Sequence, residues 1–327
     1  MNTITLSGIQ PTGKLHIGNY LGALKNFVDL QNSGEHTNFF CVVDHHSLTT
    51  TLRPEDRHAS TIDVAASYLA AGLNPKKSTL FIQSLVRAHT ELAWILSTLT
   101  PLGELGRMTQ FKDKSESGNN NAGLLTYPIL MAADILLYDA NFIPVGEDQL
   151  QHLELVRIIA RKFNHQFGPT FIEPKPLMTA IPRLMSLDNP EKKMSKTSPA
   201  GCLFLDDEPD QVRKKINRAV TDSENIVRYD KEKQPGIANL LRIASAFSNK
   251  SIKEVEGLFK KSTNYGDFKK YVAEVIIDHL ASFQKEKTTL LQNPKKVIKI
   301  FEKGSEAASK IADKKLAEVK KKIGLLT

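Results

Sequence analysis

The chain has 327 residues, enough for two domains with separate cores. Its composition, 41% hydrophobic and 24% charged with a net charge of +8, is typical of a globular protein, and no apolar run approaches the roughly 20 residues that a membrane helix requires. Residues 1–6 lack the pattern of a targeting signal, so we expect a cytoplasmic protein without membrane contact. The nine histidines and two cysteines show no zinc-site spacing, and we expect no protein-bound metal.

Most of the positive charge lies near the C-terminus. Residues 251–327 contain 17 lysines and 10 acidic residues, which gives this segment +7 of the +8. A basic segment of this kind suits a phosphate backbone. Lysines on helices also form ordinary solvated surfaces, so the charge alone leaves nucleic-acid binding open.

Strand-like and helix-like segments alternate along the first two-thirds of the chain. The expected strands lie at Thr3–Ile9, 39–44, Thr79–Ile82 and 141–145, with helical patterns at 17–30 and 55–71 between them. Such alternation predicts βαβ units and a parallel sheet. After Thr197 a linker rich in proline and glycine follows, and from Gln211 onward the pattern is helical. We therefore expect a Rossmann-like, doubly wound α/β domain over residues 1–200 and an all-helical domain over residues 201–327.

A glycine-containing loop follows the first expected strand and leads into a helix. It contains Gln10, Pro11, Thr12 and Gly13, and the segment His16-Ile17-Gly18-Asn19 then opens the helix. The backbone N–H groups of such a loop and the positive potential of a helix start suit a phosphate group. His16 and Asn19 lie on one face of the first turn, where both can donate to phosphoryl oxygens. Alternatively, His16 merely caps the helix.

A second signature, Lys193-Met194-Ser195-Lys196-Thr197, lies in a polar, proline-flanked loop far downstream. Its two lysines, three residues apart, can hold a triphosphate and neutralise pyrophosphate as it departs. Taken alone, the segment also fits an ordinary basic surface loop. The occurrence of both signatures in this order favours phosphate chemistry.

A third element follows the expected strand at 141–145 and begins an amphipathic helix. Gly146, Glu147 and Asp148 stand at this junction, followed by Gln149. Acidic side chains suit the first turn of a helix, which explains part of their presence. In an α/β domain, ligands bind where strands end and helices begin. These residues are therefore also placed to meet the ribose and adenine of a nucleotide, and Gln149 to meet an ammonium group.

One carboxylate, Asp134, interrupts the apolar run of residues 127–138. Burying a carboxylate is costly unless another group donates a hydrogen bond to it. A nearby backbone or tyrosine donor would satisfy Asp134 and leave it a structural residue. The functional alternative is an acceptor that recognises an indole N–H, which can only donate.

Six segments together resemble the bacterial tryptophan–tRNA ligases of the class I aminoacyl-tRNA synthetase family. They lie at residues 7–13, 108–112, 127–138, 145–149, 193–197 and 219–224, and the likeness extends along essentially the whole chain. The resemblance implies that ATP, with Mg²⁺, activates L-tryptophan to tryptophanyl-adenylate, and that the amino acid passes to tRNA(Trp) with release of AMP and diphosphate. It also implies a homodimer whose contact is formed largely by residues 90–175, with the tRNA anticodon bound by the helical domain.

The resemblance also assigns roles to individual residues. The matches to catalytic positions are His16, Asn19, Lys193 and Lys196. The matches to ATP contacts are Gln10, Pro11, Thr12, Gly18, Asn19, Gly146, Glu147, Asp148, Leu184, Lys193, Met194, Ser195, Lys196 and Thr197. The matches to the tryptophan pocket are Leu6, Tyr127, Met131, Asp134, Ile143, Val145 and Gln149. A mobile ATP-contacting lysine matches Lys112 or Lys114.

Two of these positions depart from the family. Leu6 replaces a common phenylalanine of the tryptophan pocket, and Thr197 stands where serine is usual, which keeps a hydroxyl. The single tryptophan of the chain, Trp94, has no role in the motif and is expected in the core or in an interface.

Three alternative functions follow from the same residues. The tyrosine–tRNA ligase of the same class shares both phosphate signatures, but the Met-Ala-Ala-Asp context of Asp134 favours tryptophan. An inactive RNA-binding paralogue would be expected to lose signature residues, yet all four catalytic positions are occupied. A nucleotidyltransferase that does not use tRNA would leave the basic helical domain without a use.

Overall fold

The computed structural model describes residues 3–109, 121–146, 149–178, 184–260, 262 and 264–327. The chain divides into two compact units. The first consists of Met1–Gly13, Asn26–Thr179 and Asn293–Thr327, and the second consists of Lys14–Lys25 and Ala180–Gln292. The limits of these units differ from the boundary expected at residue 200, because the C-terminal helix packs within the first unit.

Five parallel strands form the sheet of the first unit, in the order β3-β2-β1-β4-β5. The strands are β1 (Thr3–Ile9), β2 (His36–Val42), β3 (Thr79–Ile82), β4 (Phe142–Val145) and β5 (Lys175–Met178). The strand order reverses between β1 and β4, where Thr5 pairs with Phe142. This arrangement confirms the predicted doubly wound α/β fold, whose ligands bind outside the carboxyl ends of the strands at such a reversal.

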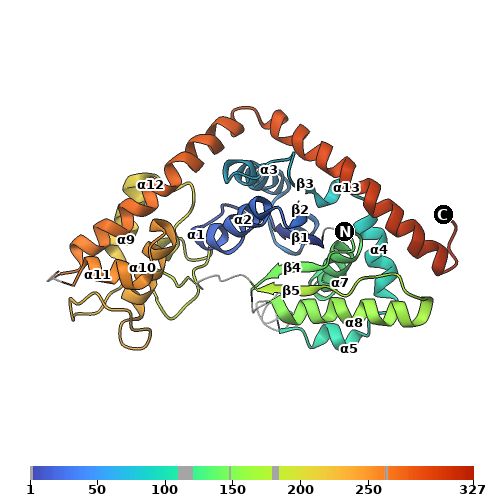
Figure 1. Ribbon diagram of the computed structural model, residues 1–327, viewed down its shortest axis with the longest axis horizontal. Coiled ribbons are helices and arrows are strands. Elements are labelled where there is room, and N and C mark those ends of the chain that lie inside the picture. Colours follow the sequence, from blue (N-terminus) through green and yellow to red (C-terminus); the bar gives the residue numbers. More distant parts are fainter. Residues whose placement is uncertain (1–2, 110–120, 147–148, 179–183, 261, 263) are drawn as a thin grey trace. The chain divides into compact units, whose positions relative to one another are not determined.

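Helices connect and cover the strands of the first unit (Figure 1). They are α2 (Lys25–Ser33), η2 (His45–Thr49), α3 (Pro54–Ala70), η3 (Gln83–Leu85), α4 (Ala88–Ser97), α5 (Leu102–Gly106), α7 (Ala122–Leu136) and α8 (Leu150–Phe167). In the core, α7 packs between α4 and α8. Buried apolar side chains of these helices and of β1 to β4 form one continuous cluster, which fixes the position of α7 against the strand reversal.

The last helix, α13 (Pro294–Lys322), runs past the edge strand β3 and packs against α3 and α4 (Figure 1). At the crossing, a Cβ on Gly304 would lie 1.8 Å from the backbone oxygen of Leu80, so only glycine allows this approach. The next residue, Ser305, accepts a hydrogen bond from the backbone N–H of Ile82 at 3.2 Å. The helix therefore covers an edge that would otherwise expose unpaired backbone groups.

The second unit is helical. It contains α1 (Ile17–Asn19), the π-helical turn η1 (Tyr20–Leu24), η5 (Pro199–Gly201), α9 (Pro209–Arg218), α10 (Pro235–Ser248), α11 (Ile252–Leu258) and α12 (Gly266–Leu291). The long helix α12 packs against α9 and α10. The single helix expected at 17–30 is instead divided into α1, η1 and α2, with a π-helical turn of the kind that is frequent at functional sites. Among the described residues, no helix combines the length and the apolarity needed to cross a membrane.

Candidate active site

A cavity of about 280 Å³ lies at the carboxyl ends of β1 and β4, where the strand order reverses. Its volume is close to the lower limit of small-molecule sites, roughly 300 Å³. All seven residues predicted for the amino-acid pocket line it, namely Leu6, Tyr127, Met131, Asp134, Ile143, Val145 and Gln149. The fold thus brings together residues from β1, α7 and β4 that are far apart in the sequence.

Asp134 is the buried acceptor of this cavity, and three side chains donate to its carboxylate. His46 Nε2 lies 2.9 Å from Oδ2, His89 Nδ1 lies 2.6 Å from Oδ1, and Gln83 Nε2 lies 2.7 Å from Oδ1. The donors belong to η2, α4 and η3. Asp134 is therefore held by two imidazoles and an amide from distant segments, rather than by the local backbone or tyrosine donor considered from the sequence.

These hydrogen bonds decide the charge of Asp134. Burial favours the protonated carboxyl, but the hydrogen bonds from His46 and His89 outweigh it and hold the pKa of Asp134 well below its usual value. The side chain is therefore a carboxylate at neutral pH. A charged acceptor in this position selects ligands that present a donor, because a ligand without one leaves the carboxylate short of a partner.

The remaining walls of the cavity are mostly apolar. Leu6, Ile143 and Val145 are buried and contribute only hydrocarbon surface. Tyr127 contributes an aromatic ring, and its hydroxyl forms a hydrogen bond with His152 Nε2 at 2.6 Å. Burial raises the pKa of Tyr127 to about 12, so the hydroxyl stays protonated. These walls suit an aromatic ligand that carries a single polar donor.

Some of the predicted nucleotide residues lie beside this cavity. Gln10 lines it, and its amide donates to the backbone oxygen of His46 at 2.7 Å. Thr12 closes a turn by donating its N–H to the Gln10 oxygen at 3.0 Å, with Pro11 buried between them. Gly146 directly follows β4. The predicted residues Glu147, Asp148, Lys112 and Lys114 lie outside the described residues.

The first phosphate signature belongs to the second unit, where a short backbone pairing holds it. The Ile17 N–H donates to the Leu203 oxygen at 2.9 Å, and the Leu205 N–H donates to the Leu15 oxygen at 2.9 Å. His16 lies between these two hydrogen bonds. The start of α1 is therefore fixed to a segment that lies nearly 190 residues further along the chain.

The second phosphate signature is anchored in the same unit. Met194 is buried, and its N–H donates to the backbone oxygen of Leu184 at 3.0 Å. Lys193 forms an antiparallel bridge with Met185. The hydroxyls of Ser195 and Thr197 form a hydrogen bond with each other at 2.9 Å. Leu184, predicted as an ATP contact, thus also has a structural role, because it fixes the backbone of the signature.

His16 caps α1, as the alternative considered from the sequence proposed. Its Nδ1 accepts from the Gly18 N–H at 3.0 Å, and its backbone N–H donates to Asn19 Oδ1 at 3.1 Å. Because Nδ1 accepts, the neutral ring carries its proton on Nε2. A Cβ on Gly18 would lie 2.8 Å from Nδ1, so a side chain at that position would displace the capping ring of His16. Capping therefore determines the tautomer and leaves Nε2–H as the donor.

The two signatures interact electrostatically. Burial, followed by the positive charges of Lys196 and Lys193, lowers the pKa of His16 from 6.5 to about 4. The ring is therefore neutral at physiological pH. Two ammonium groups and a neutral N–H donor in one region suit a ligand with several negative charges.

The lowered pKa predicts how activity depends on pH. A reaction that needs the neutral, N–H-donating ring of His16 should have a constant rate from about pH 8 to about pH 6 and should fall as the pH approaches about 4. The stability effect has the same direction, because the unfolded ring takes up its proton near 6.5 and the folded ring only near 4, so falling pH favours unfolding in this window. The measurement is the pH profile of kcat/KM for ATP in the first, pyrophosphate-releasing step, because kcat/KM follows the ionisation of groups in the free enzyme. An activity that rises as the pH falls through 6.5 would contradict the neutral donor.

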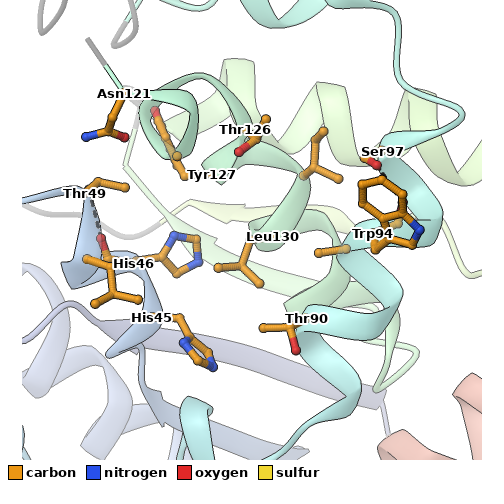
Figure 2. A pocket seen from close by; sticks show the side chains of 14 residues that line it. His45, His46, Thr49, Thr90, Trp94, Ser97, Asn121, Thr126, Tyr127 and Leu130 are labelled. Atoms are coloured by element: carbon orange, nitrogen blue, oxygen red, sulfur yellow. Dashed lines mark hydrogen bonds between the residues drawn. The ribbon is translucent and has the colours of Figure 1, made fainter. Parts of the chain in front are cut away.

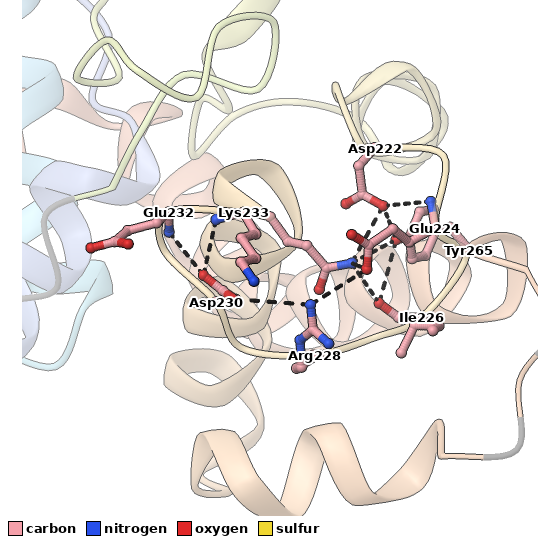
Figure 3. Close-up of polar contacts among 9 residues, drawn as sticks. Asp222, Glu224, Ile226, Arg228, Asp230, Glu232, Lys233 and Tyr265 are labelled. Atoms are coloured by element: carbon pink, nitrogen blue, oxygen red, sulfur yellow. Dashed lines mark hydrogen bonds and ion pairs between the residues drawn. The ribbon is translucent and has the colours of Figure 1, made fainter.

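The last of the six resembling segments forms part of the connection between α9 and α10 (Figure 3). The buried amide of Gln234 donates to Asp222 at 3.3 Å, and the hydroxyl of Tyr265 donates to the same carboxylate at 2.5 Å. Arg228 pairs with Glu224 at 3.4 Å. These contacts attach the connection to the start of α12. The segment at 219–224 therefore has a structural role.

Sequence reasoning missed the residues that hold Asp134. His46 and Gln83 each lie just beyond the carboxyl end of an expected strand, and these ends define the ligand edge of a parallel sheet. That position was a usable signal. His89 carries no such signal, because it lies within the first turn of α4 and only the packing of α4 on α7 brings it to Asp134.

A second groove, of about 470 Å³, adjoins the cavity and shares His46, Thr49 and Tyr127 with it. Figure 2 shows Trp94 on α4 at one end of the groove and Asn121 at the other. Trp94 is 73% exposed, so the core position considered from the sequence is wrong. An exposed tryptophan beside an apolar groove is typical of an interaction surface.

A Rossmann sheet with a polar acceptor at its strand reversal and two phosphate signatures defines a nucleotide-dependent synthetase of class I. The chain belongs to the family described as tRNA synthetases class I (W and Y), which matches residues 1–281. The resemblance found in the sequence is therefore confirmed.

Individual members of the family are similar over nearly their whole length. The tryptophan–tRNA ligase of Caldanaerobacter subterraneus subsp. tengcongensis is 50% identical over 324 residues, which is 98% of each chain. The crystal structure of tryptophanyl-tRNA synthetase from Mycoplasma pneumoniae has a TM-score of 0.91 at 35% identity and covers 100% of this chain and 99% of that chain. The enzyme from Campylobacter jejuni, in complex with ADP and tryptophan, has a TM-score of 0.86 at 35% identity and covers 99% of this chain and 100% of that chain.

Proposed function

We propose that this protein is a ligase that attaches L-tryptophan to tRNA(Trp) in two steps, with ATP as the energy source, in the cytoplasm. The observation that carries the proposal is the carboxylate of Asp134, charged and held by three donors, in an apolar cavity at the strand reversal. The names of relatives up to 50% identical over 98% of the chain support the same reading.

The amino acid would bind in this cavity. Asp134 accepts the indole N–H, and Gln149 contacts the ammonium group. The ring packs among the apolar walls, which include Leu6, Tyr127, Met131, Ile143 and Val145. Leu6 offers hydrocarbon contact without aromatic stacking. Tyrosine remains the alternative substrate, because a phenol O–H can also donate to Asp134.

The nucleotide would be held by residues of both signatures. His16, Lys193 and Lys196 oppose the phosphate charge, and Asn19 donates from its amide nitrogen. The further contacts proposed for ATP are Gln10, Pro11, Thr12, Gly18, Gly146, Glu147, Asp148, Leu184, Met194, Ser195 and Thr197. The described residues contain no group of three or more His, Cys, Asp or Glu side chains able to hold a metal ion. Mg²⁺ would therefore be held by the triphosphate itself, where it supplies charge neutralisation.

The chemistry needs no nucleophile from the protein. The tryptophan carboxylate attacks the α-phosphorus of ATP, the bond to the β-phosphate oxygen breaks, and pyrophosphate leaves as tryptophanyl-adenylate forms. A ribose hydroxyl at the end of the tRNA then attacks the adenylate carbonyl, and AMP leaves. Catalysis consists of alignment and charge stabilisation, and neutral His16 and the signature lysines are suited to stabilise the charge.

The experiment that tests the proposal is ATP–pyrophosphate exchange across the twenty amino acids. We expect exchange to be fastest with tryptophan and lower by several orders of magnitude with phenylalanine, which leaves the buried acceptor without its partner. Exchange that is fastest with tyrosine would establish the alternative. Exchange without subsequent tRNA charging would leave only the adenylate-forming half of the proposal.

A homodimer is the proposed assembly, with residues 90–175 providing much of the contact. The groove in Figure 2 supports this assignment, because Trp94 lines it and is 73% exposed. Leu102, in the same segment, is 75% exposed. Large exposed apolar side chains next to a groove are typical of surfaces between subunits. Light scattering that gives the mass of a single 36.4 kDa chain at micromolar concentration would exclude this assembly.

For tRNA, we propose contact with the helical region after residue 201, and with α13 in particular. Six exposed lysines lie three, four or seven residues apart along one side of α13: Lys296, Lys299, Lys303, Lys310, Lys314 and Lys321. No ion pair or hydrogen bond joins the ammonium groups of these six lysines to other residues of the described chain, whereas Lys315 and Lys320 pair with Asp139 and Glu91. The row is about 38 Å long at 1.5 Å per residue, and Glu302, Glu306 and Asp313 flank it on one side. A row of unpaired cations of this length suits a phosphate backbone.

Removing two of these lysines tests the contact. The variant Lys303→Gln/Lys310→Gln should weaken tRNA binding and reduce the slope of log K against log salt by about 1 to 2, because each lost phosphate contact removes about 0.7 to 0.9. Pyrophosphate exchange, which does not involve tRNA, should not change. The matched control is Lys76→Gln/Lys77→Gln, which removes two exposed lysines from a loop before β3. An equal change in slope for both variants would contradict a specific role for α13.

A further inference from the structure

Two buried residues that do not line the cavity, His89 and Tyr138, support the carboxylate of Asp134. His89 is 0% exposed, and its Nδ1 lies 2.6 Å from Asp134 Oδ1. Its other nitrogen, Nε2, lies 2.8 Å from the hydroxyl of Tyr138, which is 1% exposed. Tyr138, His89 and Asp134 thus form a hydrogen-bonded chain that ends at the cavity.

The direction of this chain follows from the donors available. A carboxylate only accepts, so His89 Nδ1 must carry the proton that faces Asp134. In the neutral imidazole the opposite nitrogen then accepts, and the Tyr138 hydroxyl donates to it. Both ring nitrogens are occupied, and packing against Phe81 at a centroid distance of 5.9 Å fixes the ring. His89 therefore has one tautomer and one orientation.

The two oxygens of Asp134 differ in how many donors they have. Oδ1 accepts from both His89 and Gln83, at 2.6 and 2.7 Å. Oδ2 accepts from His46 at 2.9 Å. Each carboxylate oxygen has two lone pairs, so Oδ1 is saturated by these two donors and Oδ2 retains one acceptor position. His46 also lines the cavity, which places Oδ2 on the ligand side of the carboxylate.

We propose that His89, oriented by Tyr138, is a specificity-determining positioning residue that saturates Oδ1 of Asp134 and directs the remaining acceptor position of Oδ2 to the N–H of the amino-acid ring. The proposal rests on the proposed function, since it assumes that the ring of tryptophan occupies the cavity. His89 itself touches no substrate. It acts only by fixing the rotamer of Asp134 and by taking up the lone pairs that would otherwise compete for the donor.

The test uses a pair of substrates that differ only in the ring donor. In β-(3-benzothienyl)alanine, a sulfur atom replaces the indole N–H and the shape is nearly unchanged. For the variant His89→Leu, the KM for tryptophan in pyrophosphate exchange should rise by about 10- to 100-fold, because a hydrogen bond to a charged group is weakened. The KM for the analogue, which has no donor to lose, should change by less than about threefold. A change in cavity shape alone would raise both values equally.

Two milder variants separate the donor from the ring. His89→Asn keeps a nitrogen donor near the place of Nδ1 and should restore most of the affinity for tryptophan. Tyr138→Phe removes the hydroxyl that fixes the tautomer and should give an intermediate rise in KM for tryptophan only. If His89→Leu does not fold, as judged by circular dichroism, these two variants carry the test.

The outcomes distinguish this proposal from the proposed function. An equal rise in KM for tryptophan and for the analogue, or no rise for either, overturns the role of His89. Asp134→Asn, measured in parallel, tests the acceptor itself. If Asp134→Asn alters the preference for tryptophan over the analogue while the His89 and Tyr138 variants do not, only the positioning role is wrong. If none of the variants alters that preference, the assignment of Asp134 as the indole acceptor is wrong as well.

Discussion

Replacing Lys196 by alanine is expected to lower kcat for tryptophan-dependent pyrophosphate exchange by about 100- to 1000-fold, the usual effect of removing a group that stabilises transition-state charge. The reason lies in the signature regions of the second unit. Lys196 is close enough to His16 to lower the pKa of that ring, so its charge acts in the region proposed to hold the phosphates. The KM for tryptophan should change little, because the amino-acid cavity is formed by residues of the first unit.

The matched control for this variant is Lys192→Ala. Lys192 is exposed and carries the same charge in the same loop, but its backbone makes the hydrogen bonds near the signature. Its oxygen accepts from the Ser186 N–H at 2.8 Å, and its N–H donates to the Asn189 oxygen at 3.0 Å. Exchange by Lys192→Ala should remain within about twofold of the unchanged enzyme, as for most surface substitutions. Equal losses for the two variants would mean that the loop needs only general positive charge, and no loss for Lys196→Ala would remove that lysine from the catalytic residues.

Replacing Asp134 by asparagine is expected to reduce kcat/KM for tryptophan by about 100-fold while changing kcat/KM for phenylalanine little, because only tryptophan donates to the carboxylate. Discrimination between the two amino acids should therefore shrink by a similar factor. Asp134→Ala should lose discrimination too, and it should also destabilise the fold by about 3–5 kcal/mol, since it leaves His46, His89 and Gln83 without their shared acceptor.

A carboxylate three residues beyond the end of α7 provides the control. Asp139 pairs with Lys315 at 2.9 Å and is absent from the walls of the cavity. Asp139→Asn should lower stability modestly and leave the tryptophan-to-phenylalanine ratio unchanged. If Asp134→Asn also leaves that ratio unchanged, the acceptor for the ring donor must be a different group.

The sequence predicted the sheet better than its edges. β1 and β3 have the predicted bounds, because short runs rich in apolar and β-branched residues mark the strands of a parallel sheet. The edge strand β5 (Lys175–Met178) was missed, since its lysine and proline and its mostly exposed side chains give no strand pattern. The π-helical turn η1 was also missed, because helical periodicity does not distinguish it from the α-helix expected at 17–30.

The boundaries of the two units depend on packing between distant segments, which local sequence patterns do not show. α13 reads as a continuation of the helical region, yet Gly304 and Ser305 join it to β3 in the first unit. Conversely, residues 14–25 read as part of the α/β region, yet the pairing of Leu15 and Ile17 with Leu205 and Leu203 places them in the second unit. Contacts between such distant segments leave no periodic signal along the chain.

The candidate site was predictable where a side chain is unusual for its surroundings. Asp134 stood out as a single carboxylate in an apolar helix, and the cavity beside it is also lined by the other six residues predicted for the pocket. Its partners were not predictable in the same way, because a histidine in the first turn of a helix, such as His89, is unremarkable until the fold places it against the carboxylate. His16 shows the opposite case, since the cap expected as an alternative to a functional role also selects the tautomer that can donate.

A crystal structure of this protein with tryptophan bound tests the central claim most directly. We predict that the indole nitrogen lies within hydrogen-bonding distance, about 2.7–3.2 Å, of Asp134 Oδ2, with the ring among Leu6, Met131 and Val145. Tryptophan bound with its ammonium group at Asp134, or with its ring outside this cavity, would contradict it.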